Sequence, residues 1–205
     1  LGEVEKDLKN NQYSPVYFLQ GNESFYIDQI SDYIEKNALD EASKGFNQTI
    51  MYGKDCEMNT VLTNARRFPM MSEKQVVIVK EAQEISDLGK EQGDKLLLDY
   101  VQHPLPSTIL VFCHKYKSID KRKSIYKALE KHCVLVETKK MYDNQLPAWI
   151  NSYVTSKGQT INVKATQMLA DFIGNDLERM SNEIDKLLIN FKEKIEIDGA
   201  LIQKH

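Results

Sequence analysis

Cysteine is scarce in this chain, with three residues among 205. Cys56, Cys113 and Cys133 are widely spaced and odd in number, so the sequence describes neither a disulfide framework nor a zinc site. We expect them to be reduced packing residues of a cytoplasmic protein, with two of them in strands. A chain of this length can bury a sizeable core without such cross-links.

Long apolar runs and an excess of positive charge are also missing. No apolar run approaches the roughly 20 residues that a membrane-spanning helix needs, and residues 1–10 are charged and amphipathic rather than a signal peptide. We therefore expect no membrane partner. The formal net charge is -3, so the chain as a whole offers no basic field for nucleic acid. Contact with DNA would have to be local or through another subunit.

Motifs for catalysis and metal binding are missing as well. The four histidines have no mutual spacing suited to a metal, and no Gly-x-Ser-x-Gly motif is present. Paired carboxylates such as Asp40 and Glu41 are best explained as solvated charge. The sequence therefore predicts no catalytic residue, no metal ion and no cofactor.

What the sequence does contain is an alternation of strand and helix patterns over its first two thirds. The expected strands, which are short and apolar, lie at 15–20, 46–52, 76–79, 108–113 and 133–136. The expected helices lie at 1–10, 23–36, 57–66, 94–102 and 117–131. This alternation predicts an α/β fold with a mostly parallel five-stranded sheet and flanking helices.

The composition changes at residues 138–143, which are rich in lysine, so we expect domains at 1–140 and 141–205. The second shows only helix patterns, at 146–156, 163–173 and 176–191, and a three-helix unit this small would be marginal alone. Its last residues predict an extended piece that enters a new helix ending at His205. We therefore expect a further domain to be absent from this chain.

A phosphate-binding loop is expected where the first strand meets its helix, at Gly21 and Asn22, but the chemistry of such a loop is missing. It needs several glycines to wrap phosphate, followed by Lys with Ser or Thr. Gly21 stands alone, and no Lys-Ser or Lys-Thr follows it. An active ATPase would end its third strand in Asp-Glu, whereas this one ends in Lys80 and Glu81, which we interpret as solvated. We expect no nucleotide binding.

Three large apolar side chains, Phe68, Met70 and Met71, surround Pro69 in a connection that would normally be polar. Two explanations stay open: the side chains fold back into the core, or they face a partner. Spacing alone favours the core, because exposed apolar clusters are uncommon on monomers.

A second candidate site is basic. Lys117, Lys121, Arg122 and Lys123 open the expected helix 117–131 with few acidic residues nearby. A solvated helix face is one explanation, and a local contact with a backbone phosphate or an acidic subunit surface is the other. Two functions beside a protein-binding one therefore stay open. They are an ATP-binding enzyme with an atypical loop at 21–25 and a DNA-binding module that uses the basic helix.

Five segments carry a resemblance to a known family. They are VYFLQGNE at 16–23, FPMMSEKQVVIVK at 68–80, LVF at 110–112, LPAWI at 146–150 and GNDLERMSNEIDKL at 174–187. In this order and spacing they resemble the delta subunits of bacterial DNA polymerase III, in the clamp-loader branch of the AAA+ ATPases. The resemblance covers nearly the whole chain. It implies an AAA+-like (RecA-like) sheet domain followed by a small helical lid, without the C-terminal collar domain.

The resemblance also implies a function. Members of this family dock on the ring-shaped beta sliding clamp, insert paired apolar residues into a clamp pocket and promote ring opening for loading onto primed DNA, without hydrolysing ATP. Those residues fall on Met70 and Met71, beside Phe68 and Pro69, so the resemblance favours an exposed site. This chain departs from the family pattern, because members of the family often have two aromatic residues at the positions of Met70 and Met71.

Partners and the loss of enzymatic activity follow from the same resemblance. It implies contacts with the clamp, with the gamma/tau and delta-prime subunits and, through the assembled complex, with primer-template DNA. The sensor arginine of active relatives falls on Glu178, with Arg179 one position on, which agrees with lost nucleotide contacts. The chain is then a non-catalytic accessory subunit of a DNA-directed DNA polymerase, a nucleotidyltransferase.

Overall fold

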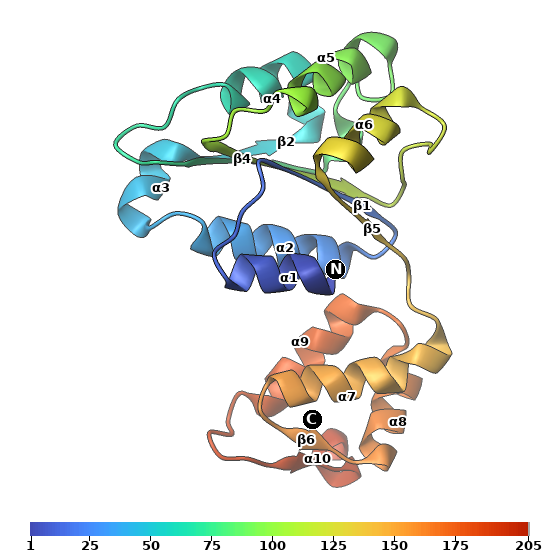
Figure 1. Cartoon of the computed structure of the whole chain (residues 1–205). Helices are drawn as coiled ribbons and strands as arrows, with labels where there is room; N and C mark the ends of the chain where they lie inside the picture. The colour runs from blue at the N-terminus through green and yellow to red at the C-terminus, as the bar shows by residue number, and fades with distance from the viewer. Residues whose placement is uncertain (205) are drawn as a thin grey trace. The chain divides into compact units, whose positions relative to one another are not determined.

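The computed structural model describes residues 1–204, which fold into two compact units (Figure 1). Unit 1 is Leu1–Lys139, and unit 2 begins at Lys140. Unit 1 contains the five-stranded sheet, and unit 2 consists mainly of helices. None of the helices within residues 1–204 is long and apolar enough to cross a membrane.

Unit 1 is built around a parallel sheet. Its strands are β1 (Val16–Gly21), β2 (Gln48–Tyr52), β3 (Gln75–Lys80), β4 (Thr108–Lys115) and β5 (Val134–Thr138). Their order is β2-β3-β4-β1-β5, and each neighbouring pair is parallel. The α/β class and the five-stranded sheet expected from the sequence are confirmed. Because parallel strands run in one direction, their carboxyl ends meet at one edge of the sheet.

Helices cover both faces of this sheet (Figure 1). One face carries α1 (Gly2–Lys9) and α2 (Ser24–Asn37), and the other carries α4 (Met58–Ala65), α5 (Glu91–Gln102) and α6 (Ser124–His132). Alternate residues of β1 face the two sides of the sheet. Tyr17 and Leu19 pack in the core on the side of α1 and α2, and Val16 and Phe18 pack in the core on the side of α4, α5 and α6. A strand buried on both faces is apolar throughout, which explains the lack of alternation in the sequence.

A helix that the sequence analysis missed, α3 (Glu41–Asn47), joins α2 to β2. Asp40 caps it, because its Oδ1 accepts a hydrogen bond from the Ser43 main-chain N–H at 2.8 Å. The strand expected at 46–52 therefore begins only at Gln48. Asp40 is exposed to solvent, as expected, and its carboxylate also caps a helix.

The helix expected at 117–131 is also corrected, because α6 begins at Ser124. Asp120 Oδ1 accepts a hydrogen bond from the Arg122 main-chain N–H at 2.9 Å, and the Lys117 carbonyl lies 2.8 Å from His114 Nδ1. A side chain that bonds the main chain two residues ahead competes with helix formation. The basic residues at 117–123 therefore belong to a loop.

Unit 2 contains α7 (Leu146–Ser156), α8 (Val163–Ile173), α9 (Leu177–Leu188) and α10 (Gly199–Lys204). The strands β6 (Thr160–Ile161) and β7 (Glu196–Ile197) form a short parallel pair. The sequence predicted the extended piece that contains β7 and the helix after it, but not β6 or the pairing. Gln159 supports this pair, since its Nε2 donates to the Glu193 carbonyl at 3.0 Å and its Oε1 accepts from the Ile195 N–H at 2.6 Å. The expected end of the last helix, His205, lies outside the described residues.

Two smaller expectations are wrong. The helix expected at 176–191 ends at Leu188, where residues 189–190 form a turn and the Phe191 N–H donates to the Leu188 carbonyl at 3.0 Å. Phe191 is 36% exposed rather than in the core. Among the cysteines, only Cys113 lies in a strand, and Cys133 directly precedes β5. All three thiols are free.

Candidate functional site

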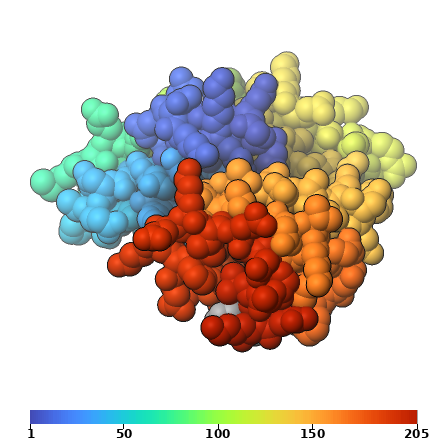
Figure 2. Space-filling view, turned by 90° about the horizontal axis from the view of Figure 1, so that it is seen from below, coloured from blue at the N-terminus to red at the C-terminus, as the bar shows by residue number. Residues whose placement is uncertain are grey.

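The loop between α4 and β3, residues 66–74, presents three large apolar side chains. Phe68, Met70 and Met71, together the apolar tip, are 77%, 60% and 101% exposed. Pro69 beside them is half-buried. Figure 2 shows the turquoise residues of this loop protruding at the edge of unit 1. The core location that spacing alone favoured is therefore wrong for these side chains.

Asn47, the last residue of α3, holds the apolar tip with its side-chain amide. Its Oδ1 accepts a hydrogen bond from the Met70 N–H at 2.6 Å, and its Nδ2 donates to the Met70 carbonyl at 2.8 Å. The Nδ2 also donates to the Ser43 carbonyl within α3, at 3.2 Å. Asn47 is 3% exposed, so these bonds are shielded from water. Both main-chain groups of Met70 are thus bonded by a residue 23 positions away.

Gln75, the first residue of β3, anchors the other end of the loop and is 4% exposed. Its Nε2 lies 3.2 Å from the carbonyls of Asn64 and Ala65 and within hydrogen-bonding distance of the Arg67 carbonyl. Thr108 Oγ1 lies 2.9 Å from the same nitrogen. The last carbonyls of a helix have no partner within it, so Gln75 satisfies the end of α4 while it fixes the loop.

Met71 adopts a left-handed backbone conformation, with φ at 55°. That conformation costs a residue with a side chain roughly 1–2 kcal/mol, and glycine or asparagine is usual in such positions. Burial does not compensate this cost, because the Met71 side chain is fully exposed. The fold of unit 1 therefore does not explain a methionine at this position.

Basic side chains near the apolar tip lie over aromatic rings of unit 1. The Arg66 guanidinium is 5.3 Å from the centre of the Tyr100 ring, and Lys74 Nζ is 5.2 Å from that of Tyr13. Such contacts direct the charges toward the body of the unit. Residues 68–71, between these two basic residues, carry no charge.

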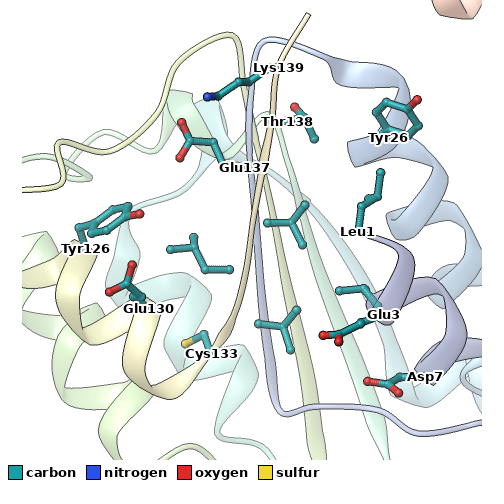
Figure 3. A pocket seen from close by; sticks show the side chains of 14 residues that line it. Leu1, Glu3, Asp7, Tyr26, Tyr126, Glu130, Cys133, Glu137, Thr138 and Lys139 are labelled. Atoms are coloured by element: carbon teal, nitrogen blue, oxygen red, sulfur yellow. The ribbon is translucent and has the colours of Figure 1, made fainter. Parts of the chain in front are cut away.

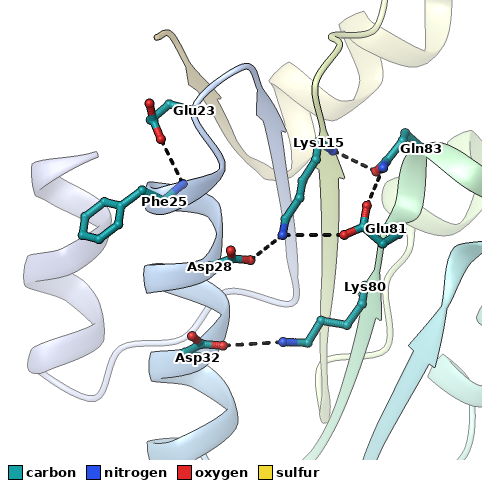
Figure 4. A network of polar contacts seen from close by, with 8 residues as sticks. All are labelled: Glu23, Phe25, Asp28, Asp32, Lys80, Glu81, Gln83 and Lys115. Atoms are coloured by element: carbon teal, nitrogen blue, oxygen red, sulfur yellow. Dashed lines mark hydrogen bonds and ion pairs between the residues drawn. The ribbon is translucent and has the colours of Figure 1, made fainter. Parts of the chain in front are cut away.

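Ligands of open α/β sheets bind beyond the carboxyl ends of the strands, and here ion pairs occupy that edge (Figure 4). Lys115 Nζ, at the end of β4, lies 2.8 Å from Asp28 Oδ1 and 3.6 Å from Glu81 Oε1, while Lys80 Nζ lies 3.5 Å from Asp32 Oδ1. Burial lowers the pKa of Lys115, but the hydrogen bond and charge of Asp28, with Glu81, outweigh it and raise the pKa above its usual value. Glu81, expected to be solvated, is therefore half-buried and paired.

The loop after β1 is closed by contacts within the chain. Gly21 has φ at 124°, and a Cβ there would collide with the Thr138 carbonyl oxygen, so β5 requires glycine at this position. The Asn22 N–H donates to that carbonyl at 3.2 Å, and the Glu23 N–H donates to Thr138 Oγ1 at 3.1 Å. Glu23 Oε1 accepts from the Phe25 N–H at 3.2 Å (Figure 4). Main-chain amides that would wrap a phosphate are thus engaged, and a carboxylate lies at the start of α2.

The basic loop before α6 has acidic partners for most of its candidate residues. The closest approaches are Lys121 Nζ to Glu137 Oε2 at 3.9 Å, Arg122 Nη2 to Asp120 Oδ2 at 2.8 Å and Lys123 Nζ to Asp94 Oδ2 at 3.8 Å. The hydrogen bond from Arg122 holds the pKa of Asp120 down to about 2. The loop is therefore partly neutralised from within the chain, unlike an open phosphate-binding patch.

A groove of about 600 Å³ runs along β5, an edge strand of the sheet (Figure 3). Four carboxylates line it, those of Glu3, Asp7, Glu130 and Glu137. None of the candidate site residues at 68–71 and 117–123 lies in its lining. An acidic lining is unsuited to the phosphates of a nucleotide or of DNA.

Glu178, on which the resemblance places the sensor arginine of active relatives, and Arg179, one position on, are both exposed in the first turn of α9. The Arg179 main-chain N–H donates to Asp176 Oδ1 at 3.0 Å, which caps this helix. No group of three or more histidine, cysteine or acidic side chains within residues 1–204 is placed to hold a metal ion.

The sequence of the chain matches the model of a known protein family. A model of the family described as DNA polymerase III, delta subunit, matches residues 17–139. The chain belongs to this family. The match covers the sheet of unit 1 from β1 to β5, and it includes both the apolar tip and the closed loop at Gly21.

Two relatives extend this result beyond unit 1. DNA polymerase III subunit delta of Bacillus subtilis (strain 168) is 28% identical over 206 residues, which cover 97% of this chain and 59% of the relative. A solved structure, the Bacillus subtilis DNA clamp loader delta protein (YqeN), superposes with a TM-score of 0.78 at 27% identity. That match covers 95% of this chain and 59% of the solved one. The chain thus spans about three fifths of the length of these delta subunits.

Sequence reasoning missed the residues that hold the site. The sequence points to Asn47 only indirectly. Asp40 followed by Glu41 is typical of a helix start, so this pattern could have predicted α3, the helix that ends at Asn47. Gln75 is a polar residue at the head of an apolar strand, and its burial explains why it stands there. Glu23 and Thr138 close the phosphate loop, but they lie 115 positions apart, so no local pattern joins them.

Proposed function

We propose that this chain is the part of a clamp-loader delta subunit that binds the beta sliding clamp and promotes its opening for loading onto primed DNA. The observation that carries the proposal is the apolar tip, in which Met70 and Met71 are exposed on a loop whose main chain is fixed by Asn47. Phe68 and Pro69 form the base of the contact. The family of the chain supports the same function, as does the name of the solved relative, a DNA clamp loader delta protein.

Methionine is physically suited to such a contact. Its side chain is unbranched and polarisable, so it can fill an irregular apolar pocket. Complete burial of Met70 and Met71 would contribute roughly 3–6 kcal/mol before the costs of association. A contact of this size would strongly affect affinity, although it would not form a whole interface.

We further infer that the chain hydrolyses no ATP and acts as an accessory subunit of a DNA-directed DNA polymerase, a nucleotidyltransferase, in the cytoplasm. Support comes from the phosphate loop, where Glu23 occupies the start of α2, and from Lys115, which is paired with Asp28 and Glu81. The gamma/tau and delta-prime subunits are the proposed loader partners. Primer-template DNA is reached through the assembled complex.

The two alternative functions have less support. An ATP-binding enzyme would need free amides after β1, and those of Asn22 and Glu23 are bonded to Thr138. A direct DNA-binding module would need unpaired cations before α6, and Arg122 and Lys123 have acidic partners. Neither alternative has an observation that favours it over clamp binding.

The proposal is tested by measuring the affinity of the chain for the sliding clamp of the same organism. We expect Met70→Ala/Met71→Ala to bind about a hundredfold more weakly, the factor that corresponds to the loss of roughly 3 kcal/mol. The matched control is Val163→Ala/Phe172→Ala, which removes two side chains of unit 2 that are 87% and 85% exposed. If a folded Met70→Ala/Met71→Ala variant bound the clamp as tightly as the wild type, the proposed clamp-binding role of these residues would be wrong.

A further inference from the structure

The amide of Asn47 bonds to Met70 as a neighbouring β-strand would. One side chain both accepts from the Met70 N–H, at 2.6 Å, and donates to the Met70 carbonyl, at 2.8 Å. A carboxamide carries its acceptor and its donors on two separate atoms of one planar group, whereas an ionised carboxylate only accepts, an apolar side chain does neither, and a hydroxyl donates and accepts through a single oxygen. Both bonds therefore depend on asparagine at this position.

These bonds act on a strongly exposed part of unit 1. Asn47 is 3% exposed, whereas the Met70 and Met71 side chains are 60% and 101% exposed. A loop tip with no buried side chains would ordinarily sample many conformations. Here the main chain of Met70 is fixed from α3, and Met71 follows it in a left-handed conformation that a free chain rarely adopts. The direction of both methionine side chains is thus set before any partner arrives.

We propose that Asn47 is a positioning residue for clamp binding, which preorganises the apolar tip for an apolar pocket on the clamp. This inference rests on the proposed function. A tip that is already ordered loses less conformational freedom on binding, so more of the burial free energy appears as affinity. Without Asn47 the same methionines are present, but they must be ordered during binding.

The test is a double-mutant cycle on clamp affinity with four chains: the wild type, Asn47→Ala, Met70→Ala/Met71→Ala and the combined variant. We expect Asn47→Ala to weaken binding about tenfold, which corresponds to about 1.4 kcal/mol. Adding Asn47→Ala to the chain without the methionines should change the affinity little further, because the positioned side chains are gone. An equal loss in both backgrounds would show a general effect on folding and overturn the proposal.

Hydrogen exchange supplies a readout that does not depend on the clamp. In Asn47→Ala the Met70 amide should exchange at least about tenfold faster, while the amides of β3 remain protected. Asn47→Asp keeps the acceptor and the size of the side chain, but it places a carboxylate against the Met70 carbonyl. It provides a second test should Asn47→Ala not fold, and we expect it to lower affinity as well. Unchanged exchange and affinity in Asn47→Asp would contradict the positioning role.

Gln159→Ala is the matched control. Gln159 is 8% exposed and uses its amide in the same way, bonding the main chain at Glu193 and Ile195 in unit 2. We expect a comparable loss of thermal stability with no change in clamp affinity. The outcomes separate the two proposals: if Met70→Ala/Met71→Ala binds normally, the proposed function fails. If that variant binds weakly and Asn47→Ala binds normally, only the positioning role fails.

Discussion

Lys115 at the end of β4 forms an ion pair with Asp28 on α2, with 2.8 Å between Nζ and Oδ1. The Lys115 side chain is 13% exposed, and Glu81 Oε1 lies 3.6 Å away on its other side. The pair joins a covering helix to the strand edge at which ligands of α/β sheets bind. That edge therefore has a structural role in this chain, since its charges are matched internally.

Asp28→Asn should destabilise unit 1. It would leave a largely buried ammonium group with only Glu81 as a partner, so we expect the free energy of unfolding to fall by about 1–2 kcal/mol. That value lies between those of surface and buried pairs because the Asp28 side chain is 36% exposed. Urea denaturation measures the change.

Asp32→Asn is the matched control for this pair. Asp32 lies 3.5 Å from Lys80 and is 64% exposed, so its loss should cost under about 0.5 kcal/mol. Equal losses in the two variants would show that the Lys115 pair has no special role.

Gly21→Ala should be among the most damaging small substitutions in the chain. Its Cβ would collide with the Thr138 carbonyl oxygen, and a φ of 124° is unfavourable for alanine. We expect the free energy of unfolding to fall by about 3 kcal/mol or more, or the variant to fail to fold. The control is Gly89→Ala, where φ is 90° but no atom lies within 4 Å of the added carbon.

Gly89→Ala should lower the free energy of unfolding by only about 1 kcal/mol, because the backbone strain of a positive φ is its sole effect. Thermal denaturation of both variants separates the steric effect from the backbone effect. A Gly21→Ala variant as stable as Gly89→Ala would mean that β5 does not require glycine at this position.

Cys113 and Cys133 should make the protein less stable as the solution becomes alkaline. Burial raises the pKa of Cys113 from 9.0 to about 11 and that of Cys133 to about 12. Because the folded pKa exceeds the unfolded one, this contribution is complete below about pH 9 and is lost as the pH rises toward 11 and 12. Between pH 8 and pH 10 we expect the free energy of unfolding to fall by about 1 kcal/mol for each of the two cysteines.

Urea denaturation at the two pH values measures this effect, and Cys113→Ala/Cys133→Ala is the reference chain. Other groups titrate in the same range, so the informative quantity is the difference between the pH dependence of the two chains. The same pH dependence in both would contradict the assignment.

Local patterns were sufficient for most elements of this fold. The helices α7 and α8 begin and end where the sequence predicted, because Pro147 opens the first, Asn162 caps the second and Gly174 ends it. The errors occurred where one side chain changed the local structure. Asp120 bonds the main chain ahead of it and delays α6, and Asp40 caps a helix in a stretch that otherwise looked like the approach to a strand.

The sequence by itself determined the parallel sheet, its covering helices and the loss of phosphate-binding residues, because these depend on local composition and spacing. Only the tertiary structure decided that Phe68, Met70 and Met71 are exposed, since the same apolar spacing suits a loop that folds back and a loop that protrudes. The deciding contact joins Asn47 to Met70 across 23 positions of the chain. Because Asn47 and Met70 meet only in the folded unit, no pattern among neighbouring residues of the sequence can reveal their contact.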